Sequence, residues 1–427
     1  YGQPTETDLW LGAIQGLIGS LDDPYTRYFS QEEYEHFQSS LGESFVGIGV
    51  TIENINEQVV VRKVWTNSPA ERAGIRSGDL ITHVDGVDYT NKTYLQTIAD
   101  IQGEAGTEVE IGVRRTGQAD TLFFTMTRAT IDNPSVIAEV FEQEGKTIGY
   151  IKVNTFGTHT FSLFSSYLDM LENDSNIDGL IIDLRDNGGG YLTTVQNMLN
   201  LFLTDTGTPM FSIEQFRNNE LDREEYHADN DESKPYNIVT LINGNSASAS
   251  EVFAAGMMEH SNYPVVGTTS FGKGTMQVTR PLLFGGGDEL HNSTGRWLTP
   301  NDNWINNIDG DYLGVIPNIY TEQNPYFLTY RIFLSEGEAL TYDTVSTRTE
   351  NAQRILNALG YEVREDGYFD QNTKSIVERF QADNNLTVTG TINPETANLL
   401  SDQLLDYIQA YENDTQLQAA LEVFSND

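Results

Sequence analysis

Cysteine is absent from the 427 residues of the chain. Disulfide bonds and thiolate zinc sites are therefore excluded, and no thiol can serve as a nucleophile. Histidine is scarce as well, and the six histidines show none of the spacings that bind a metal. His260 fits the last turn of a helix, where a cation is stabilised. We expect no metal and no other cofactor.

Basic residues are few. The chain has 24 Lys and Arg against 63 Asp and Glu, which gives a formal net charge of −39. Phosphate contacts require Lys and Arg, so this balance argues against a nucleic acid partner and disfavours anionic membrane surfaces. An acidic surface of this kind keeps a protein soluble and suits a salty or extracellular medium.

Long hydrophobic runs are also missing. No stretch approaches the roughly 18 apolar residues that a membrane helix requires, and no signal peptide precedes Tyr1. Because the sequence opens on Tyr1-Gly2-Gln3 without a methionine, we expect that the natural protein carries an upstream signal or membrane anchor.

The length and the 38% hydrophobic content predict several packed domains. Hydrophobic periodicity, turn residues and the alternation of strand and helix patterns indicate their order. The expected parts are an N-terminal helical region over 1–40, a small β-rich domain over 41–128, α/β layers over 129–345, a compact helical unit over 346–402 and an acidic tail over 403–427. Within the α/β part, the charged residues 214–235 predict a solvated loop.

A serine follows a predicted buried strand, Asn237 to Ile242, and opens a helix. Ser248 stands at the sharp turn between them, where unpaired amides at the helix N-terminus can hold an oxyanion. The pattern has a second interpretation, because Ser248 and Glu251 also fit a capping box that only stabilises the helix. No Gly-x-Ser-x-Gly elbow is present.

A lysine flanked by glycines follows another apolar strand. Lys273 can act as a general base only when it is neutral, which requires a pKa lowered by desolvation in an apolar pocket. We expect that pocket from Phe271, Met276 and Val278. Gln277, four residues further on, can orient the amine. Taken alone, the segment favours a solvated turn lysine.

The third candidate is a glycine-rich turn, Asn187 to Gly190, between an apolar strand and a helix. Backbone amides in such a turn can cradle an anion. The turn lacks the Gly-Lys-Ser/Thr ending of a phosphate-binding loop and the spacing of a dinucleotide fingerprint. An oxyanion hole and a plain tight turn both fit.

Together these segments resemble the carboxy-terminal processing peptidases, also called tail-specific proteases, over nearly the whole chain. The likeness rests on Leu21 to Tyr25, Gly149 to Ile151 with Phe156, Asp183 to Gly190, Ser246 to Glu251, Phe271 to Gly274 with Gln277, and Leu298 to Pro300. One departure is Gly188, where a proline is common in the family.

The resemblance implies a role for each matching position. It implies that Ser248 is the nucleophile, Lys273 the general base 25 positions later and Gln277 the orienting residue. The amides of Gly189 and Ala249 would form the oxyanion hole. The fold it implies is multidomain α/β (α+β), with N-terminal helices, a PDZ domain, a serine-peptidase core of the crotonase/Clp-like type and a small three-helix C-terminal domain.

Two further segments resemble known binding modules. Residues 45–128 look like a PDZ domain, with Gly47, Ile48, Gly49 and Val50 as the loop that binds a terminal carboxylate. In relatives this module presents substrate tails and gates the active site, although Gln102 stands where many of them carry arginine.

Residues 346–401 resemble the type 1 peptidoglycan-binding domain. The motifs that carry this likeness are Leu359 to Tyr361, Asp366 to Phe369, Phe380-Gln381 and Thr389-Gly390. The same apolar spacing also makes a plain three-helix core.

The sequence therefore predicts a serine endopeptidase that cleaves exported polypeptides with accessible C-terminal tails. It is expected outside a bacterial cell, anchored by a helix, with peptidoglycan and a second copy of itself as further partners. One alternative is a catalytically silent scaffold attached to the cell wall. Another is a hydrolase that acts on cell-wall peptides.

Overall fold

The computed structural model divides the chain into two compact units. The first contains Tyr1–Glu43, Asn133–Glu322 and Thr415–Asp427, and the second contains Ser44–Asp132 and Gln323–Asp414. The structure describes residues 6–40, 44–55, 58–65, 68–76, 78–90, 94–115, 120–132, 134–217, 220–282, 287–307, 314–329, 332, 334 and 337–425. The chain thus leaves the first unit twice and returns to it each time.

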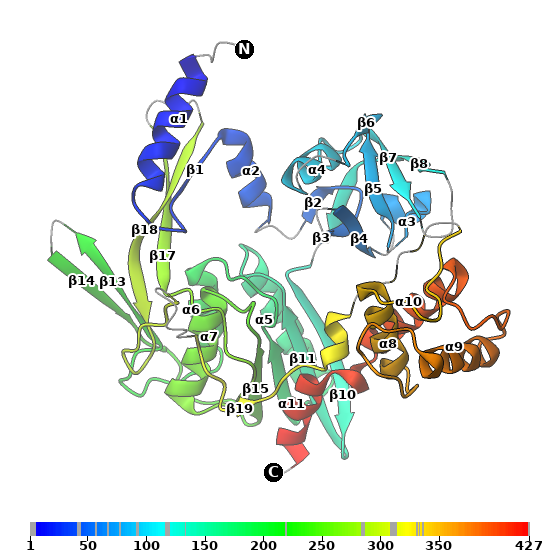
Figure 1. Cartoon of the computed structure of the whole chain (residues 1–427). Coiled ribbons are helices and arrows are strands. Elements are labelled where there is room, and N and C mark those ends of the chain that lie inside the picture. The colour runs from blue at the N-terminus through cyan, green and yellow to red at the C-terminus, as the bar shows by residue number, and fades with distance from the viewer. Residues whose placement is uncertain are drawn as a thin grey trace. The chain divides into compact units, whose positions relative to one another are not determined.

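A six-stranded sheet forms the middle of the first unit (Figure 1). In spatial order its strands are β10 (Val136–Gln143), β11 (Lys146–Val153), β12 (Gly179–Asp183), β15 (Asn237–Ile242), β16 (Val265–Gly267) and β19 (Ile319–Tyr320). β10 and β11 form an antiparallel hairpin, and all pairings from β11 to β19 are parallel. Parallel strands are covered on both faces, which explains the unbroken apolar runs of β12 and β15. The predicted α/β class is confirmed.

Helices pack on both faces of this sheet. The helices α5 (Thr160–Asn173), α6 (Leu192–Leu199) and α7 (Ala249–Ala255), the last continued by a π-helical turn over Gly256–His260, cover one face, and α11 (Thr415–Ser425) covers the other. Successive side chains of a strand point to opposite faces. In β12, Ile182 accordingly joins the core with α5, α6 and α7, whereas Ile181 joins the core with α11.

The end of the chain belongs to this core. The expectation of an acidic tail over 403–427 is wrong, because Leu417, Leu421 and Phe424 of α11 are buried against the sheet. Their spacing is that of an amphipathic helix, and the acidic Glu422 lies on its exposed side. The prediction relied on the acidic residues, which lie on the surface of this segment, and did not take account of its apolar stripe.

A second sheet in the first unit consists of short and long antiparallel strands. These are β1 (Arg27–Phe29), β18 (Glu289–Leu298), β13 (Phe211–Arg217) and β14 (Glu220–Tyr226), with β17 (Thr275–Pro281) also paired to β18. The solvated loop predicted over 214–235 is thus partly wrong. β14 is a strand whose side chains are nearly all exposed, because pairing with β13 satisfies its backbone while its charges stay in water.

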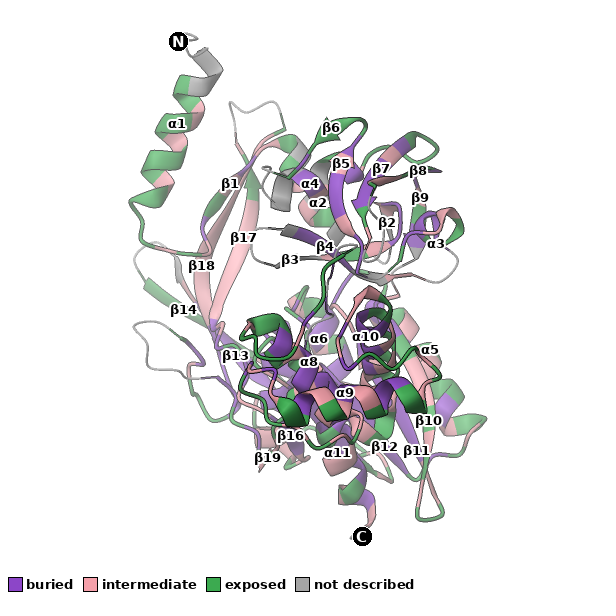
Figure 2. Ribbon diagram, turned by 45° about the vertical axis from the view of Figure 1, so that its right-hand side comes forward, coloured by how far each residue is buried: buried purple, intermediate pink, exposed green. Residues whose placement is uncertain are grey.

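The N-terminal region is helical around β1, as expected. α1 (Glu6–Gly19) precedes β1 and α2 (Gln31–Ser40) follows it. Much of α1 is exposed (Figure 2). Its large apolar side chains include Trp10, which is 65% exposed, and Leu17, which is 69% exposed. No helix in the described ranges is long and apolar enough to cross a membrane.

The β-rich part of the second unit is built on a six-stranded sheet. Its strands run β3 (Val50–Ile55), β4 (Gln58–Val64), β5 (Leu80–Val84), β7 (Glu108–Arg114) and β8 (Leu122–Thr127), with β6 (Val87–Asp88) paired to β5. The remaining elements are the strand pair β2 (Ser44–Gly47) and β9 (Ala129–Asp132) and the helices α3 (Pro69–Ala73) and α4 (Tyr94–Ile101). Because β9 pairs with β2, this part extends to Asp132, four residues beyond the predicted end.

The helical part of the second unit contains α8 (Thr347–Ala358), α9 (Gln371–Asp383) and α10 (Pro394–Gln409) with the 3₁₀ turns Pro325–Leu328 and Tyr411–Asn413. Its core includes Ile332, Leu334 and Leu340. The sequence assigned these three residues to the α/β domain, up to 345, and the structure corrects that boundary. Buried apolar side chains before α8 are the physical reason, since they complete the helical core.

Candidate functional site

Ser248 lies on a strained turn between β15 and α7. Its φ of 55° and ψ of −113° fall in a region that residues with a side chain rarely adopt, at a cost of about 1–3 kcal/mol. An ordinary helix cap has extended backbone angles, so capping alone would not require this strain. The side chain is half-buried. Such a turn is typical of a nucleophile presented between a strand and a helix.

The glycine-rich turn packs directly on Ser248. A Cβ built on Gly189, whose φ is 109°, would lie 2.9 Å from the Ser248 Cβ and 3.1 Å from the Ala249 nitrogen, so only glycine fits there. The carbonyl oxygen of Asn187 accepts hydrogen bonds from the Ala247 amide at 3.0 Å and the Ser250 hydroxyl at 2.8 Å. These bonds fix the turn against the segment that carries Ser248.

The two amides predicted for the oxyanion hole differ in this structure. The Ala249 amide, the first of α7, has no hydrogen-bond acceptor in the described part of the chain, as expected at a helix N-terminus. The Gly189 amide instead donates to Asn187 Oδ1 at 2.9 Å. In this conformation the Gly189 amide, which the sequence predicted for the oxyanion hole, is therefore already hydrogen-bonded to the Asn187 side chain.

Glu251 connects the serine segment with the lysine segment. Its buried carboxylate accepts hydrogen bonds from the amides of Ser248 (2.7 Å), Gly272 (2.6 Å) and Lys273 (2.8 Å) and from the Ser270 hydroxyl (2.6 Å). Burial raises its pKa, and the four hydrogen bonds oppose that shift. The sequence suggested a capping role for Glu251. Its contacts to Gly272 and Lys273 add a second role, which is to hold the lysine segment against the serine segment.

Lys273 lies in surroundings that favour its neutral form. Burial lowers the pKa of its ammonium and the Arg27 guanidinium lowers it further, while the Glu251 and Asp23 carboxylates work in the opposite direction. The expected apolar pocket is partly wrong: Phe271 is 42% exposed, and Val278 lines a different cavity. After the bulge between Met276 and Gln277, successive side chains of β17 alternate, so Gln277 and Thr279 face the cleft and Val278 faces the other cavity.

Lys273 and Ser248 line one cleft without being hydrogen-bonded to each other in the described chain. The amine lies 5.0 Å from the centre of the Tyr25 ring. Gln277 lines the same cleft, and its Nε2 donates to Thr275 Oγ1 at 2.9 Å and to Ser293 Oγ at 3.3 Å. Catalytic hydrogen bonds are often loose without substrate.

The cleft has a volume of about 690 Å³. All the catalytic and oxyanion residues predicted from the sequence line it, together with aromatic and aliphatic side chains. The predicted site residues are Ser248, Lys273, Gln277, Gly189 and Ala249, and the apolar ones include Tyr34, Phe37, Met276 and Trp297. Among the described residues, no group of three His, Asp or Glu is arranged to hold a metal.

Several residues of this cleft were missed by reasoning from the sequence. Arg27 and His291 both line it, and burial and the nearby Arg27 lower the pKa of His291 to about 4. The Leu21 to Tyr25 motif was the available indication that this segment matters. What the sequence could not show is that β1 pairs with β18 and so brings Arg27 to the cleft.

Replacing Arg27 by methionine is expected to move the acid limb of the pH–rate profile to higher pH. Removing the nearby cation raises the pKa of Lys273, so a higher pH is needed to obtain the neutral amine. Arg280→Met is the matched control, because Arg280 lies on the same sheet and lines the other cavity. Identical pH profiles for the two variants would contradict this assignment.

The predicted peptide-binding loop joins β2 to β3 in the second unit. Ile48 is buried, and its carbonyl accepts a hydrogen bond from the Ala70 amide at 2.8 Å. Gly49 has a φ of 78°, and a Cβ there would lie 2.3 Å from the Ser68 Cβ. Among the described strands, β3, which begins at Val50, stands at one end of its sheet, where a further strand could pair.

Comparison with known proteins agrees with this architecture. Residues 147–321 match the model of peptidase family S41, residues 46–123 match a PDZ domain and residues 346–400 match a putative peptidoglycan binding domain. The chain is 36% identical over 411 residues to the carboxy-terminal processing protease CtpB of Bacillus subtilis, covering 96% of this chain and 83% of that protein. The chain belongs to the carboxy-terminal processing proteases of family S41.

Other members of the family give the same picture. The carboxy-terminal processing protease CtpA of Bacillus subtilis is 31% identical over 428 residues, covering all of this chain and 88% of that protein. Among solved structures, the photosystem II D1 C-terminal processing protease aligns with a TM-score of 0.50 and 26% identity, covering 75% of this chain and 83% of that one. The resemblance to this serine protease family is therefore confirmed.

Proposed function

We propose that the chain is an endopeptidase that uses Ser248 and Lys273. Ser248 attacks the carbonyl carbon of the scissile amide, while neutral Lys273 accepts the hydroxyl proton and returns it to the leaving amine. The main support is one cleft that contains both a serine on a strained turn and a lysine with a lowered pKa. None of these steps calls for a metal or cofactor.

The oxyanion of the tetrahedral intermediate would be held by backbone amides. Ala249 supplies one amide from the N-terminus of α7, where the helix dipole adds partial positive charge. The second would come from Gly189 after the Asn187 side chain releases it. Gln277 would turn from Thr275 toward Lys273 and orient the amine.

We propose that the PDZ domain gates the site through these two rearrangements. In this structure the Gly189 amide and the Gln277 amide are both engaged elsewhere, as expected of a resting enzyme. A captured peptide would shift the population toward the aligned form only if that form binds the peptide more tightly.

The experiment that tests the function is incubation of the chain with casein, followed on a gel. We expect fragments from the unmodified chain, none from Ser248→Ala, and covalent labelling of Ser248 by a fluorophosphonate. The same resting features favour one rival, a silent scaffold attached to the wall, which would leave casein intact. A hydrolase of wall peptides would release muropeptides instead.

We also propose that the PDZ domain captures substrate tails. The loop over Gly47 to Val50 would bind the terminal carboxylate, and the peptide would extend the sheet along β3. A peptide with a free C-terminus is expected to bind at least about tenfold more tightly than its amidated form, because amidation removes charge-assisted hydrogen bonds. Fluorescence anisotropy measures both, and equal affinities would contradict this mode of capture.

The setting of the enzyme is a proposal as well. The helical domain supports an association with peptidoglycan, and the net charge of −39 supports the absence of nucleic acid partners. We place the protein outside the cytoplasm, at the cell surface or secreted, and anchored by an N-terminal membrane helix.

A homodimer is proposed through α1. Trp10 and Leu17 are about two-thirds exposed, and a second copy of α1 would bury them. Trp10→Glu combined with Leu17→Glu is expected to halve the mass measured by light scattering. A monomeric unmodified chain would contradict the proposal.

A further inference from the structure

A buried ion pair lies immediately before the glycine-rich turn. Asp183 is fully buried at the end of β12, and its carboxylate accepts hydrogen bonds from Arg185 Nη2 at 2.6 Å and from Tyr150 Oη at 2.7 Å. Arg185 Nε also donates to both carboxylate oxygens at 3.0 Å. Burying two charges is costly unless their hydrogen bonds are complete, so every partner of this pair matters.

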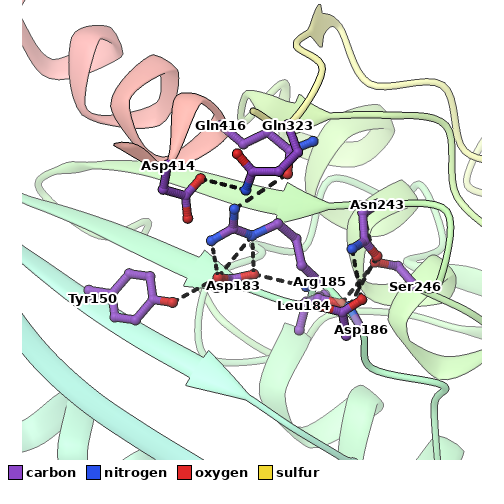
Figure 3. Close-up of polar contacts among 10 residues, drawn as sticks. All are labelled: Tyr150, Asp183, Leu184, Arg185, Asp186, Asn243, Ser246, Gln323, Asp414 and Gln416. Carbon is purple, nitrogen blue, oxygen red and sulfur yellow. Dashed lines mark hydrogen bonds and ion pairs between the residues drawn. The ribbon is translucent and has the colours of Figure 1, made fainter. Parts of the chain in front are cut away.

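One partner of the pair comes from the other end of the sequence. Gln416 of α11 is 1% exposed, and its Oε1 accepts a hydrogen bond from Arg185 Nη1 at 3.3 Å (Figure 3). Its Nε2 donates to the carbonyl of Thr321 at 2.9 Å. The Gln416 amide is therefore fixed on both sides and holds Arg185 from the face of the sheet opposite α7.

The backbone then leads from Arg185 directly into the turn. Asp186 receives two cross-links from the serine segment, with its Oδ1 accepting from Asn243 Nδ2 at 3.0 Å and from Asn245 Nδ2 at 2.8 Å. The Ser246 hydroxyl donates to the carbonyl of Leu184 at 2.8 Å (Figure 3). The turn is thus held from the serine side by these bonds and from the α11 side through Arg185.

We propose that α11 is a positioning element of the peptidase site, and that Gln416 acts through Arg185 to hold the turn over residues 186–190 against Ser248. Packing supports the fixed place of α11: a Cβ on Gly179 would lie 2.4 Å from the Phe424 ring, and Lys146 Nζ donates to the Phe424 carbonyl at 2.7 Å. This inference rests on the proposed function of the turn in catalysis.

The test compares two variants that each remove a polar contact of α11. Gln416→Leu removes the acceptor for Arg185 and the donor to the Thr321 carbonyl. Ser425→Ala removes the hydroxyl that accepts from Gln143 Nε2 at 3.1 Å, at the far end of the helix. We expect Gln416→Leu to lower kcat about tenfold with KM changed less than twofold, because small misplacements of catalytic groups cost rate. Ser425→Ala should keep the kcat of the unmodified chain. Gln416→Glu keeps an acceptor for Arg185 but loses the donor to the Thr321 carbonyl, so it should recover part of the rate.

The rate of amide hydrogen exchange is a measurement that does not depend on activity. Gln416→Leu should speed exchange across residues 184–191, and Ser425→Ala should leave it unchanged. Unchanged exchange in Gln416→Leu overturns the inference whether or not the chain cleaves casein. If the unmodified chain is active and Gln416→Leu has the same kcat, the inference is also overturned, while the proposed function stands.

Discussion

Replacing Lys273 by alanine is expected to lower kcat for an unstructured polypeptide by about 10²- to 10⁴-fold, the range that a positioned general base contributes. The reason is that a serine hydroxyl is a weak nucleophile unless a neighbouring base takes its proton. In this chain burial and the Arg27 guanidinium lower the pKa of Lys273, which favours the neutral amine that the proposed mechanism requires. The KM should change little, because the amine acts on the proton rather than on the substrate.

The controls for this prediction use a second lysine and the proposed nucleophile. Lys234→Ala removes a lysine that pairs with Glu172 at 2.6 Å and lines a different cavity, so it should keep full activity. Ser248→Ala should be as inactive as Lys273→Ala, and the double variant no worse than either, since the two residues act as a unit. Retention of a tenth or more of the activity by Lys273→Ala would refute the mechanism.

The second large effect is expected at Glu251. Glu251→Gln keeps the shape of the side chain but replaces one acceptor oxygen by a donor. That donor then faces either the amides of Ser248 and Lys273 or the Gly272 amide and the Ser270 hydroxyl. We expect kcat to fall about 10²-fold with a modest change in KM, since the distance between serine and lysine is set through this carboxylate. The acid limb of the pH–rate profile should move to lower pH, because loss of the anion lowers the pKa of Lys273.

Glu259→Gln is the matched control for this variant. Glu259 follows α7 in the same helix, and its carboxylate also accepts a backbone amide, that of Asn301, at 3.0 Å. Both variants lose an anion and an acceptor, but Glu259 does not line the cleft. The fraction of folded protein should be measured by circular dichroism for each. An activity of Glu251→Gln that simply follows its folded fraction would contradict the positioning role.

The local parts of this architecture could be predicted from the sequence. Apolar runs predicted the strands β12 and β15 because both are buried on two faces, and the turn that follows β15 marked Ser248. The glycines at 189, 190 and 274 also carried local information, since a Cβ at each would lie less than 3 Å from a neighbouring atom. The resemblance to the family then predicted that these segments form one site.

What the sequence could not supply depends on contacts between distant segments. The role of Arg27 follows from a strand pairing with β18, and the burial of α11 follows from a sheet face that forms far away in the chain. The sequence predicted the Gly189 amide for the oxyanion hole, but it could not show that this amide donates to the Asn187 side chain. Side-chain direction decided the pocket of Lys273, where the bulge between Met276 and Gln277 changes which residues face the cleft.

The most direct measurement is a crystal structure of the chain with a peptidyl phosphonate bound covalently to Ser248. The account predicts that Lys273 Nζ lies within about 3.2 Å of Ser248 Oγ, with the phosphonyl oxygen on the Ala249 amide. An amine that still lies over the Tyr25 ring, out of reach of that oxygen, would contradict it.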